Sequence, residues 1–479
     1  MRRIAAAAVG LALLAGTAYL MGHMGPSVKP RRVLVFGVDG GTWHVIEPMI
    51  EAGELPNLAR YYNKGIHGEL RSRPPAISPV VWSTIFTGRL PEEHGVKDWK
   101  SSQSTYRKVK TVWEMASDKN LTAFVFNVPS TWPPTKLHGV MLSGFPLSGS
   151  QIGGNTGEVF SLEKLLDPRT KFVYRVNAAV LSNQASALEV GQWSPWFRVP
   201  LSARHAEGVM KIKRLDPDRY YFSPFYRVDE GFVLSYPPDL RDRYASKIGD
   251  FYIPEGPGWS KHAEPDTPRY LYEHILDVSK IQTRAAAAFA SGDWDLFVYV
   301  NTLVDRVSHP YWAYMEPDAF DDVDPAKAKK YQDTVREAYR QMDVQLGQVL
   351  ANVGGDDFYL VVVSDHGFGP SRNKNLLIGT HRFDGIYLVA GPGLHEARGP
   401  RINIEDTAPT ILYLLGLPTA DDLAGKLLPP LVPVLGVPKP PVRSYEYETR
   451  PGSDVPVDAQ TWEQLRGLGY VDGAPPRRH

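Results

Sequence analysis

Cysteine is absent from all 479 residues of the chain. This absence excludes disulfide bonds, thiolate metal sites, a cysteine nucleophile and a lipid-modified N-terminal cysteine. A transition metal bound by this chain must therefore be held by histidine, aspartate or glutamate. The sequence also lacks internal repeats and low-complexity tracts, and its 42 glycines and 41 prolines indicate many ordered turns.

The chain has no excess of charge of either sign, because 53 lysines and arginines balance 53 aspartates and glutamates. No overall field draws it toward nucleic acid or an acidic membrane, so specific nucleic-acid binding is not expected and no protein partner is inferred. A hydrophobic content of 43% and an aromatic content of 11% are typical of a well-packed globular protein. For this length we expect one elaborated catalytic domain with a large insertion.

The N-terminus carries the one long apolar run of the sequence. Met1-Arg2-Arg3 precedes an uncharged Ala/Leu-rich stretch over residues 4–21, so residues 1–24 are predicted to be a signal peptide or signal anchor. An uncleaved anchor is favoured because the run approaches the length of a membrane span. A buried N-terminal helix is the alternative. The prediction places the chain outside the cytoplasm, in the periplasm or cell envelope, secreted or attached to the membrane through this segment.

Short apolar runs that end in polar residues alternate with amphipathic stretches along the chain. The runs predict buried strands, and they lie at 32–38, 121–128, 295–300, 358–363 and 386–390. Helices are expected over stretches such as 56–64 and 326–353. This alternation predicts an α/β fold with a doubly wound, mostly parallel central sheet, whose ligands bind beyond the carboxyl ends of the strands.

Composition divides the chain into five parts. After residues 1–24, the catalytic core is predicted over 30–147 and again over 281–427, separated by an insertion or cap over 148–280 that is rich in Trp, Tyr and Pro and in short alternating runs. Residues 428–479 read as a proline-rich linker and a C-terminal tail, with a short helix near 459–468. The aromatic residues of the cap include Trp193, Trp196 and Tyr226. Their rings could stack on a substrate, or they could simply form part of the hydrophobic core.

Metal-binding residue types recur at separated strand ends. They are Asp39, Asp305 with His309, Asp365 with His366, and His381. Two cations held by such a set can clamp the attacking and leaving oxygens of an in-line displacement, and mixed carboxylates and imidazoles suit zinc or manganese. The Asp305/His309 spacing alone is also typical of surface neighbours, and Asp365-His366 could be a simple exit from a strand.

Ser78 is the candidate nucleophile. It precedes Pro79 and an apolar periodic segment, which is the pattern of a helix N-terminus with an N-cap serine. A hydroxyl at this position lies near backbone donors and positive partial charge, which favour an alkoxide and a phosphate. The capping and catalytic roles are compatible.

Taken together and in order, the motifs of this chain resemble those of the alkaline phosphatase superfamily, in particular its type I phosphodiesterase/nucleotide pyrophosphatase branch. The motifs that carry the resemblance are Val38-Asp39-Gly40, Ser78-Pro79-x-x-Trp82-Ser83-Thr84-x-x-Thr87-Gly88, Leu90-Pro91-x-x-His94-Gly95, Asp305-x-x-x-His309, Ser364-Asp365-His366-Gly367 and Gly379-Thr380-His381. The resemblance spans most of the chain and implies an alkaline phosphatase-like core.

This resemblance also implies a function and a ligand set. One metal would be held by Asp305, His309 and His381, and a second by Asp39, Asp365, His366 and the Ser78 oxygen, which would form a covalent phospho-enzyme during hydrolysis of a phosphate ester. Both ions are expected to be zinc, with manganese as the second choice. His94 is expected to have a structural role near the helix rather than to bind metal.

The chain departs from the branch in one respect that concerns the substrate. Where the diesterases usually carry asparagine three residues after the nucleophile, this chain has Val81, and Pro79 offers no backbone donor. We therefore expect another group to hold a phosphate oxygen and nominate Asn127, which follows a predicted strand; capping of its own loop is the alternative role for this residue.

Several other functions remain open from the sequence. A phosphomonoesterase and a phosphotransferase acting on a lipid or glycan acceptor would use the same residues. A sulfatase would need a Cys/Ser-x-Pro-x-Arg motif, and the nearest segment, Ser72-Arg73-Pro74-Pro75-Ala76, lacks the arginine. Retention of the full ligand set disfavours a non-enzymatic envelope binding protein, and the absence of a Gly-x-Ser-x-Gly elbow disfavours a metal-independent serine hydrolase.

Overall fold

A computed structural model describes most of the chain. The described residues are 31–144, 151–152, 157–167, 178–201, 206–228, 234–249, 252–254 and 269–446. The predicted N-terminal segment at 1–24 and the predicted helix at 459–468 lie outside them. None of the helices in the described part combines the length and the hydropathy that spanning a membrane requires.

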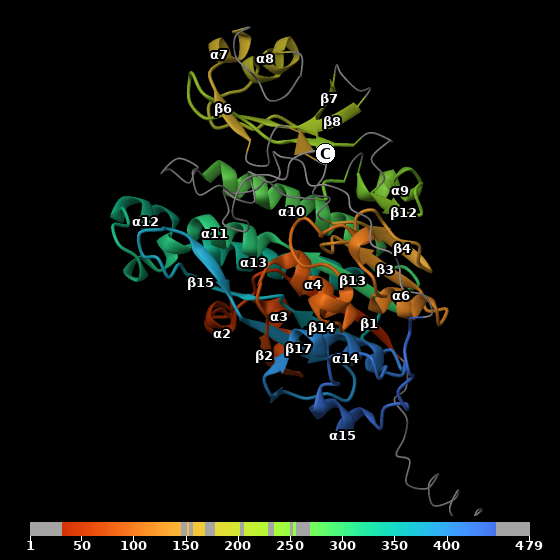
Figure 1. Ribbon diagram of the computed structural model, residues 1–479. Coiled ribbons are helices and arrows are strands. Elements are labelled where there is room, and N and C mark those ends of the chain that lie inside the picture. Colours follow the sequence, from red (N-terminus) through yellow and green to blue (C-terminus); the bar gives the residue numbers. More distant parts are fainter. Residues whose placement is uncertain are drawn as a thin grey trace, which may run out of the picture.

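A ten-stranded mixed sheet forms the centre of the molecule (Figure 1). The strand order is β12-β4-β3-β13-β1-β14-β17-β2-β18, with β19 also pairing with β2. Five adjacent strands, β4 to β14 in this order, run parallel, and β17 and β12 are antiparallel to their neighbours. Their bounds are β1 Arg32–Val38, β2 Gly65–Arg71, β3 Ala123–Phe126, β4 Gly139–Leu142, β12 Ser235–Tyr236, β13 Leu296–Asn301, β14 Phe358–Val363, β17 Asp384–Ala390, β18 Ala397–Arg398 and β19 Ile402–Asn403. The predicted mostly parallel sheet is confirmed.

Strand β1 shows why the sheet is covered on both faces. Leu34, Phe36 and Val38 belong to one hydrophobic core, whereas Val33 and Val35 belong to the other, and all five are fully buried. Successive side chains of a strand point to opposite faces, so an uninterrupted apolar run must be sandwiched between two layers. The predicted doubly wound arrangement follows from this run.

Helices build the two covering layers. On the Leu34 face they are α2 Trp43–Glu51, α3 Pro56–Tyr62, α10 Arg269–Ala290, α11 Leu303–Met315, α12 Pro325–Tyr331 and α13 Thr334–Asn352. On the Val33 face they are α4 Ser78–Thr87, α6 Val112–Ser117, α14 Thr407–Leu414 and the short α15 Val432–Leu435. The single helix predicted over 326–353 is two helices, interrupted at Gln332 and Asp333, and both α12 and α13 pack on α11.

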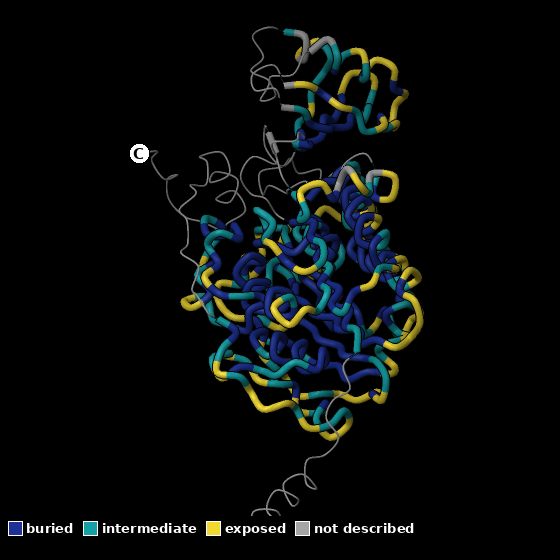
Figure 2. Tube along the Cα trace, turned by 90° about the vertical axis from the view of Figure 1, so that its right-hand side faces the viewer, coloured by how far each residue is buried: buried dark blue, intermediate teal, exposed yellow. Residues whose placement is uncertain are grey.

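The segment between the two core halves forms smaller antiparallel sheets above the core (Figures 1 and 2). Strands β5 Gln151–Ile152, β11 Phe225–Arg227, β8 Ala206–Met210 and β7 Phe197–Leu201 make one sheet; β6 Glu158–Phe160, β10 Tyr220–Phe222 and β9 Ile212–Arg214 make another. Short helices α7 Leu162–Leu166, α8 Ala178–Ser186 and α9 Leu240–Ile248 accompany them. A β-rich cap was predicted here, but helix α10 crosses the predicted boundary at residue 280 and packs on the core.

The cap rests on α10 through the aromatic residues considered above as stacking candidates. Trp193 Nε1 donates to Glu273 Oε2 at 2.8 Å and Trp196 Nε1 donates to Asp277 Oδ2 at 3.0 Å, both acceptors lying on α10. Tyr226 is buried. These rings therefore form part of the contact between the cap and the core rather than an open stacking platform.

Candidate active site

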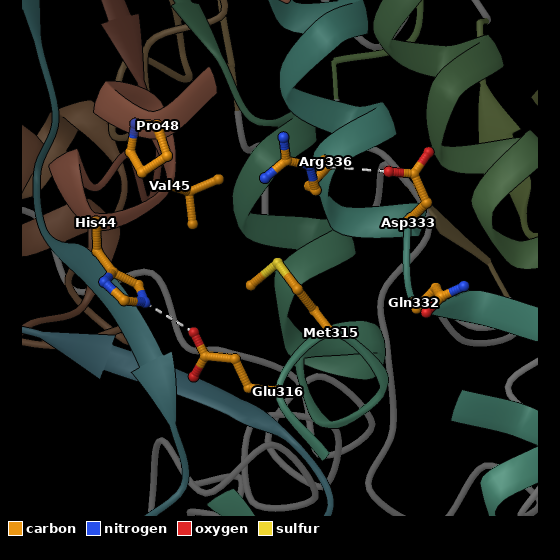
Figure 3. A pocket seen from close by; sticks show the side chains of 8 residues that line it. All are labelled: His44, Val45, Pro48, Met315, Glu316, Gln332, Asp333 and Arg336. Carbon is orange, nitrogen blue, oxygen red and sulfur yellow. Dashed lines mark hydrogen bonds and ion pairs between the residues drawn. The ribbon is translucent and has the colours of Figure 1, made fainter. Parts of the chain in front are cut away.

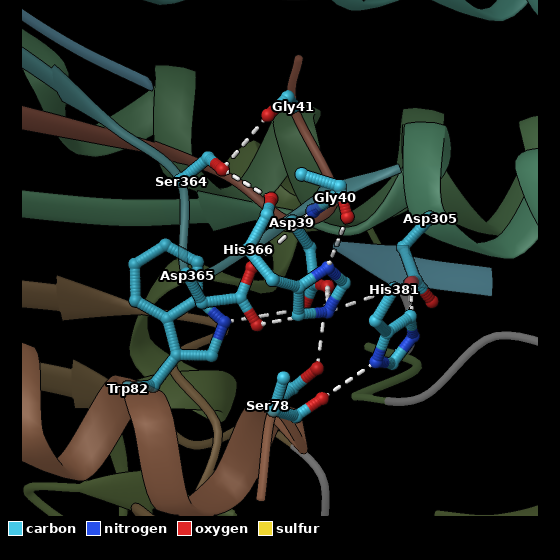
Figure 4. A network of polar contacts seen from close by, with 12 residues as sticks. Asp39, Gly40, Gly41, Ser78, Trp82, Asp305, Ser364, Asp365, His366 and His381 are labelled. Atoms are coloured by element: carbon cyan, nitrogen blue, oxygen red, sulfur yellow. Dashed lines mark hydrogen bonds and ion pairs between the residues drawn. The ribbon is translucent and has the colours of Figure 1, made fainter. Parts of the chain in front are cut away.

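Ser78 is the first residue of α4 and is buried at the carboxyl edge of the sheet. The N-cap is the extended Ile77, so the helix begins one residue earlier than the Ser-Pro pattern predicted. The Ser78 Oγ donates to Asp39 Oδ1 at 3.3 Å (Figure 4). The hydroxyl thus lies in the first turn of a helix, where unpaired N–H groups and the helix dipole favour an anion.

Sheet order brings the acidic residues to Ser78. Asp39 directly follows β1, which is paired with β13 on one side and β14 on the other. Asp365 lies two residues beyond β14, and Asp305 lies in the first turn of α11, which follows β13. Because the three parallel strands end at the same edge, carboxylates far apart in the sequence meet at one point.

Asp305, His309 and His381 form a first cluster. His309 Nε2 lies 3.5 Å and His381 Nε2 lies 3.2 Å from Asp305 Oδ1, and the two histidine nitrogens are 3.1 Å apart. The pair on α11 shares one face because the residues are four apart, while His381 comes from the hairpin of β15 Gly367–Pro370 and β16 Gly379–Arg382. Three donor atoms thus converge on one point.

Asp39, Asp365 and His366 form a second cluster beside the first. His366 Nε2 lies 3.6 Å from Asp39 Oδ1 and 3.3 Å from Asp365 Oδ2. It also lies 3.8 Å from Asp305 Oδ1, so the two clusters are adjacent. Gly40 N donates to Asp365 Oδ1 at 3.2 Å, which leaves Oδ2 directed into the cluster.

The three histidines share an orientation that suits metal binding. In each ring Nδ1 lies at hydrogen-bond distance from a backbone carbonyl, while Nε2 faces the carboxylates. The carbonyls are Gly379 O at 3.1 Å for His309, Gly367 O at 3.0 Å for His366 and Ala76 O at 2.6 Å for His381. Such a carbonyl fixes the proton on Nδ1 and leaves the Nε2 lone pair for a cation.

Buried ligand atoms without hydrogen bonds supply the strongest sign of a cation site. Asp305 Oδ1, Asp365 Oδ2 and His366 Nε2 find no hydrogen-bond partner of acceptable geometry among the described residues. Unpaired buried polar atoms are costly, and native proteins rarely leave them so. Two overlapping groups of compact ligand atoms, Asp305/His366/His381 and Asp39/Asp365/His366, share His366, and His309 Nε2 adjoins the first group at 3.5 Å from Asp305 Oδ1. The residues therefore fit two divalent cations.

Electrostatics in the protein alone also favour added positive charge. Burial and the neighbouring Asp365 and Asp305 raise the pKa of Asp39 well above its ordinary value, and burial and Asp305 raise the pKa of Asp365 to about 7. Burial would also raise the pKa of Asp305, but His309 and His381 outweigh it and lower this pKa. Three carboxylates in one buried place repel each other, and bound cations would relieve that repulsion.

The two clusters differ in exposure. The side chains of Asp305, His309 and His381 are 15%, 14% and 11% exposed, whereas those of Asp39 and His366 are 1% and 0% exposed. Solvent therefore reaches the site from the side of the first cluster. A substrate has to enter, and a leaving group has to depart, on that side.

Comparison with known families supports the reading of these motifs. A model of the family "Type I phosphodiesterase / nucleotide pyrophosphatase" matches residues 33–408, which include every ligand described above. The chain belongs to the type I phosphodiesterase/nucleotide pyrophosphatase family. The resemblance of the motifs to the type I phosphodiesterase/nucleotide pyrophosphatase branch is thereby confirmed.

Solved structures resemble this phosphodiesterase-family chain only distantly. One is a putative sulfatase from Bacteroides thetaiotaomicron, with 12% identity and a TM-score of 0.44 over 86% of this chain and 76% of the other. Another is an alkaline phosphatase superfamily protein from Vibrio parahaemolyticus, with 12% identity and 0.36 over 82% and 68%. A phosphonoacetate hydrolase from Sinorhizobium meliloti 1021 has 14% identity and 0.35 over 72% and 60%. No curated protein matches the chain at a significant level.

Asn127, the residue expected to hold a phosphate oxygen, has its side chain hydrogen-bonded to other parts of the protein. Its side chain is fully buried, and Nδ2 donates to Gln282 Oε1 at 3.2 Å and to Val300 O at 2.9 Å, while Oδ1 accepts from Tyr252 at 3.4 Å. A φ of 55° directly after β3 turns the residue toward these partners. These partners lie on α10, on β13 and at Tyr252 rather than in the loop of Asn127 itself, so the buried amide connects the end of β3 to distant parts of the core.

His94 has the structural role expected of it. The ring is fully buried, with Val96 N donating to Nδ1 at 3.1 Å and Nε2 lying 3.0 Å from Thr84 Oγ1 on α4. Burial, with Arg107 adding to it, lowers the pKa of His94 to about 3. The neutral ring therefore fixes the loop after α4 against the helix that carries Ser78.

A separate hollow lies between α2, the end of α11 and the junction of α12 and α13. It has a volume of about 580 Å³ and is lined by residues that include His44, Met315, Glu316 and Arg336 (Figure 3). His44 Nε2 lies 2.8 Å from Glu316 Oε1, so polar groups of the lining bind each other. None of the seven expected metal or nucleophile residues lines this hollow, which therefore does not compete with the Ser78 site.

Sequence reasoning gave no role to Trp82, although the residue stands inside the motif around Ser78. Its indole points into the carboxylate cluster (Figure 4) and donates to Asp39 Oδ2 at 3.2 Å. The signal in the sequence is its position four residues after Ser78, which places both side chains on one face of α4.

Proposed function

We propose that the chain hydrolyses phosphate esters, diesters first, with Ser78 as nucleophile and two divalent metal ions, zinc before manganese. The observation that carries this proposal is the convergence of buried ligand atoms that make no well-formed hydrogen bond within the described part of the chain, Asp305 Oδ1, Asp365 Oδ2 and His366 Nε2, beside a serine in the first turn of a helix. Family membership supplies the reaction class.

The residues would divide the work in the way that their contacts suggest. Asp305, His309 and His381 would hold one ion, and Asp39, Asp365, His366 and the Ser78 oxygen the other. Such ions would supply positive charge to the attacking and leaving oxygens. Ser78 Oγ would form a bond to phosphorus while the ester bond on the opposite side breaks and its alcohol departs, and water would then cleave the Ser78–phosphorus link, which for a diester substrate still carries the second ester group.

Accessibility orients the substrate in this scheme. Because only the first cluster is reached by solvent, the ester's leaving group would lie next to Asp305, His309 and His381, with the phosphorus between the clusters. Two possible hydrogen-bond donors to the phosphate are absent near Ser78. Val81 stands where the diesterases usually carry asparagine and has no polar side chain, and Pro79 has no backbone N–H. The charge of the site itself would therefore carry most of the recognition of the phosphoryl oxygens.

Location outside the cytoplasm belongs to the same proposal and rests on residues 1–24 of the sequence. A hydrolase in the envelope would meet phosphate esters there, and an uncleaved segment would keep it at the membrane. Detection of the chain in the membrane fraction with its catalytic part accessible to added protease would support this location; a cytoplasmic chain would contradict it.

The test uses the full chain. Bound metals are counted by mass spectrometry, and hydrolysis of aryl phosphate monoesters and diesters is measured with and without chelator. Ser78→Ala is compared with Ser83→Ala, a buried serine of the same helix whose Oγ donates to Pro79 O at 2.7 Å. We expect two ions per chain, loss of diester cleavage with chelator and with Ser78→Ala, and retention with Ser83→Ala.

Other outcomes would redirect or end the proposal. Metal binding with cleavage of monoesters alone would identify a phosphomonoesterase, and transfer to an added lipid or glycan alcohol in preference to water would identify a phosphotransferase. Full activity after complete metal removal would refute the two-metal scheme. A quenched reaction mixture without phosphate on Ser78, despite rapid turnover, would refute the covalent step.

A further inference from the structure

The two oxygens of Asp39 have different partners. Oδ1 accepts from Ser78 Oγ at 3.3 Å and lies 3.6 Å from His366 Nε2, so it faces the second cluster. Oδ2 accepts from Trp82 Nε1 at 3.2 Å (Figure 4). The indole N–H of Trp82 therefore distinguishes the two oxygens of Asp39. Oδ2 is occupied by the hydrogen bond from Trp82, and Oδ1 is the oxygen that can bind a cation.

The Trp82 ring is fixed in place by its surroundings. It is fully buried and stacks on Phe86, with ring centroids 5.7 Å apart and an interplanar angle of 16°. It also fills the space beside Gly37 on β1, where an added Cβ would lie 2.6 Å from Trp82 Cη2. Since the ring cannot turn, the direction of its N–H is set by the packing between α4 and β1.

A neutral donor is well suited to this position. Asp39 already lies near Asp365 and Asp305, whose charges disfavour its ionised form. Hydrogen bonding to the carboxylate stabilises the ionised form without adding a positive charge that would repel a cation. Carboxylate ligands of metals are commonly held in this way, and the partner fixes which oxygen is offered.

We propose that Trp82 is a positioning residue that presents Asp39 Oδ1 to the ion shared with Asp365 and His366. This inference rests on the proposed two-metal function. The described contacts of Trp82 reach only the second cluster, so its N–H should affect one ion and not the other. Loss of such a partner typically weakens metal affinity by about 10- to 100-fold.

Trp82→Phe tests the role because it removes the N–H and keeps an aromatic ring. The matched control is Trp113→Phe. Trp113 is buried in the same layer, packs on the same Phe86 at 5.1 Å between centroids, and its Nε1 has no hydrogen-bond partner among the described residues. Both variants lose the same group from the same core, but only one of them loses a bond to a ligand.

The measurement is metal binding to the full chain after removal of metal by chelator. Zn²⁺ is titrated by calorimetry, Co²⁺ by its visible absorption, and thermal unfolding is recorded for each protein. Wild type and Trp113→Phe should bind two ions tightly. Trp82→Phe should bind one ion as tightly as wild type and the second about 10- to 100-fold more weakly, and excess Zn²⁺ should restore its turnover.

Each other result decides against a specific claim. Wild-type affinity at both sites in Trp82→Phe would overturn the positioning role alone. Equal weakening of both sites together with a lower melting temperature would assign the ring a purely structural role and overturn it as well. Fewer than two ions on the wild type would refute the proposed function itself, and this is seen before any variant is compared.

Discussion

Replacing Asp365 with asparagine should stabilise the metal-free protein, and the gain should grow with pH. In the wild type, burial and the nearby Asp305 raise the pKa of Asp365 from its ordinary 3.8 to about 7. A carboxyl whose pKa is raised by folding stabilises the folded state fully when the pH is below its pKa in the unfolded chain. This stabilisation is lost as the pH rises to the pKa of the folded chain. The metal-free wild type is thus penalised at neutral pH, and an amide of the same shape is not.

The size of the effect follows from that difference in pKa. Between 3.8 and about 7 the folded chain keeps the Asp365 proton that the unfolded chain has lost. The penalty is about 2 kcal/mol at pH 5 and about 4 kcal/mol at pH 8. Buried histidines act in the opposite direction, because burial lowers the pKa of His309 to about 4 and of His94 to about 3. Their effect cancels when two proteins that share these histidines are compared.

The assay is therefore a difference between wild type and Asp365→Asn, both treated with chelator, in thermal unfolding at pH 5 and pH 8. The variant should unfold at the higher temperature, by roughly twice as much at pH 8 as at pH 5. With Zn²⁺ restored the order should reverse, because the variant has lost a charged ligand. An equal difference at both pH values, or a variant that is less stable than the chelated wild type, would refute the reasoning.

Further variants probe the nucleophile, the loop and the fold. Ser78→Ala should lower kcat by ~10³-fold or more while both ions stay bound, as judged by mass spectrometry; retained turnover would exclude Ser78 as nucleophile. Asn127→Ala should lower the free energy of unfolding by about 1–3 kcal/mol, since it leaves buried partners unpaired, yet preserve kcat; a large fall in kcat would return it to the phosphate site. Arg107→Met should cost about 3–5 kcal/mol in denaturant unfolding, because Glu114 Oε2 lies 2.6 Å from the Arg107 guanidinium in a buried pair. The exposed Arg198→Met serves as its control and should cost at most about 1 kcal/mol; equal costs would contradict the argument from burial.

Strand positions were predictable because burial leaves a local trace. The apolar run before Asp39 and the one before Asp365 both proved to be strands, and both are buried on two faces as their lack of alternation indicated. The break between α12 and α13 left no comparable trace, although both helices pack on the same α11. The local pattern of apolar residues indicates which residues are buried. It does not indicate which distant elements pack on them.

The candidate ligand residues could be named from the sequence for a similar reason, whereas their arrangement could not. Without cysteine only His, Asp and Glu can hold a transition metal, and the motifs placed these residues at strand ends. Which atom each offers depends on distant neighbours. His381 turns its Nε2 toward the carboxylates because the carbonyl oxygen of Ala76, 305 residues away, accepts a hydrogen bond from its Nδ1. Asn127, chosen by the same rule of strand ends, is instead turned away by hydrogen bonds to Gln282 and Val300.

The sequence by itself therefore determined the chemistry available to this protein, namely oxygen and imidazole ligands, a serine before a helix, and the strands that carry them. Only the tertiary structure decided how these groups face each other. The side-by-side pairing of β13, β1 and β14 joins Asp39 to Asp365 across 326 positions, and the packing of Trp82 against Gly37 selects which oxygen of Asp39 is offered. Residue types and spacing are local properties, whereas the direction of a side chain is set by whatever packs against it.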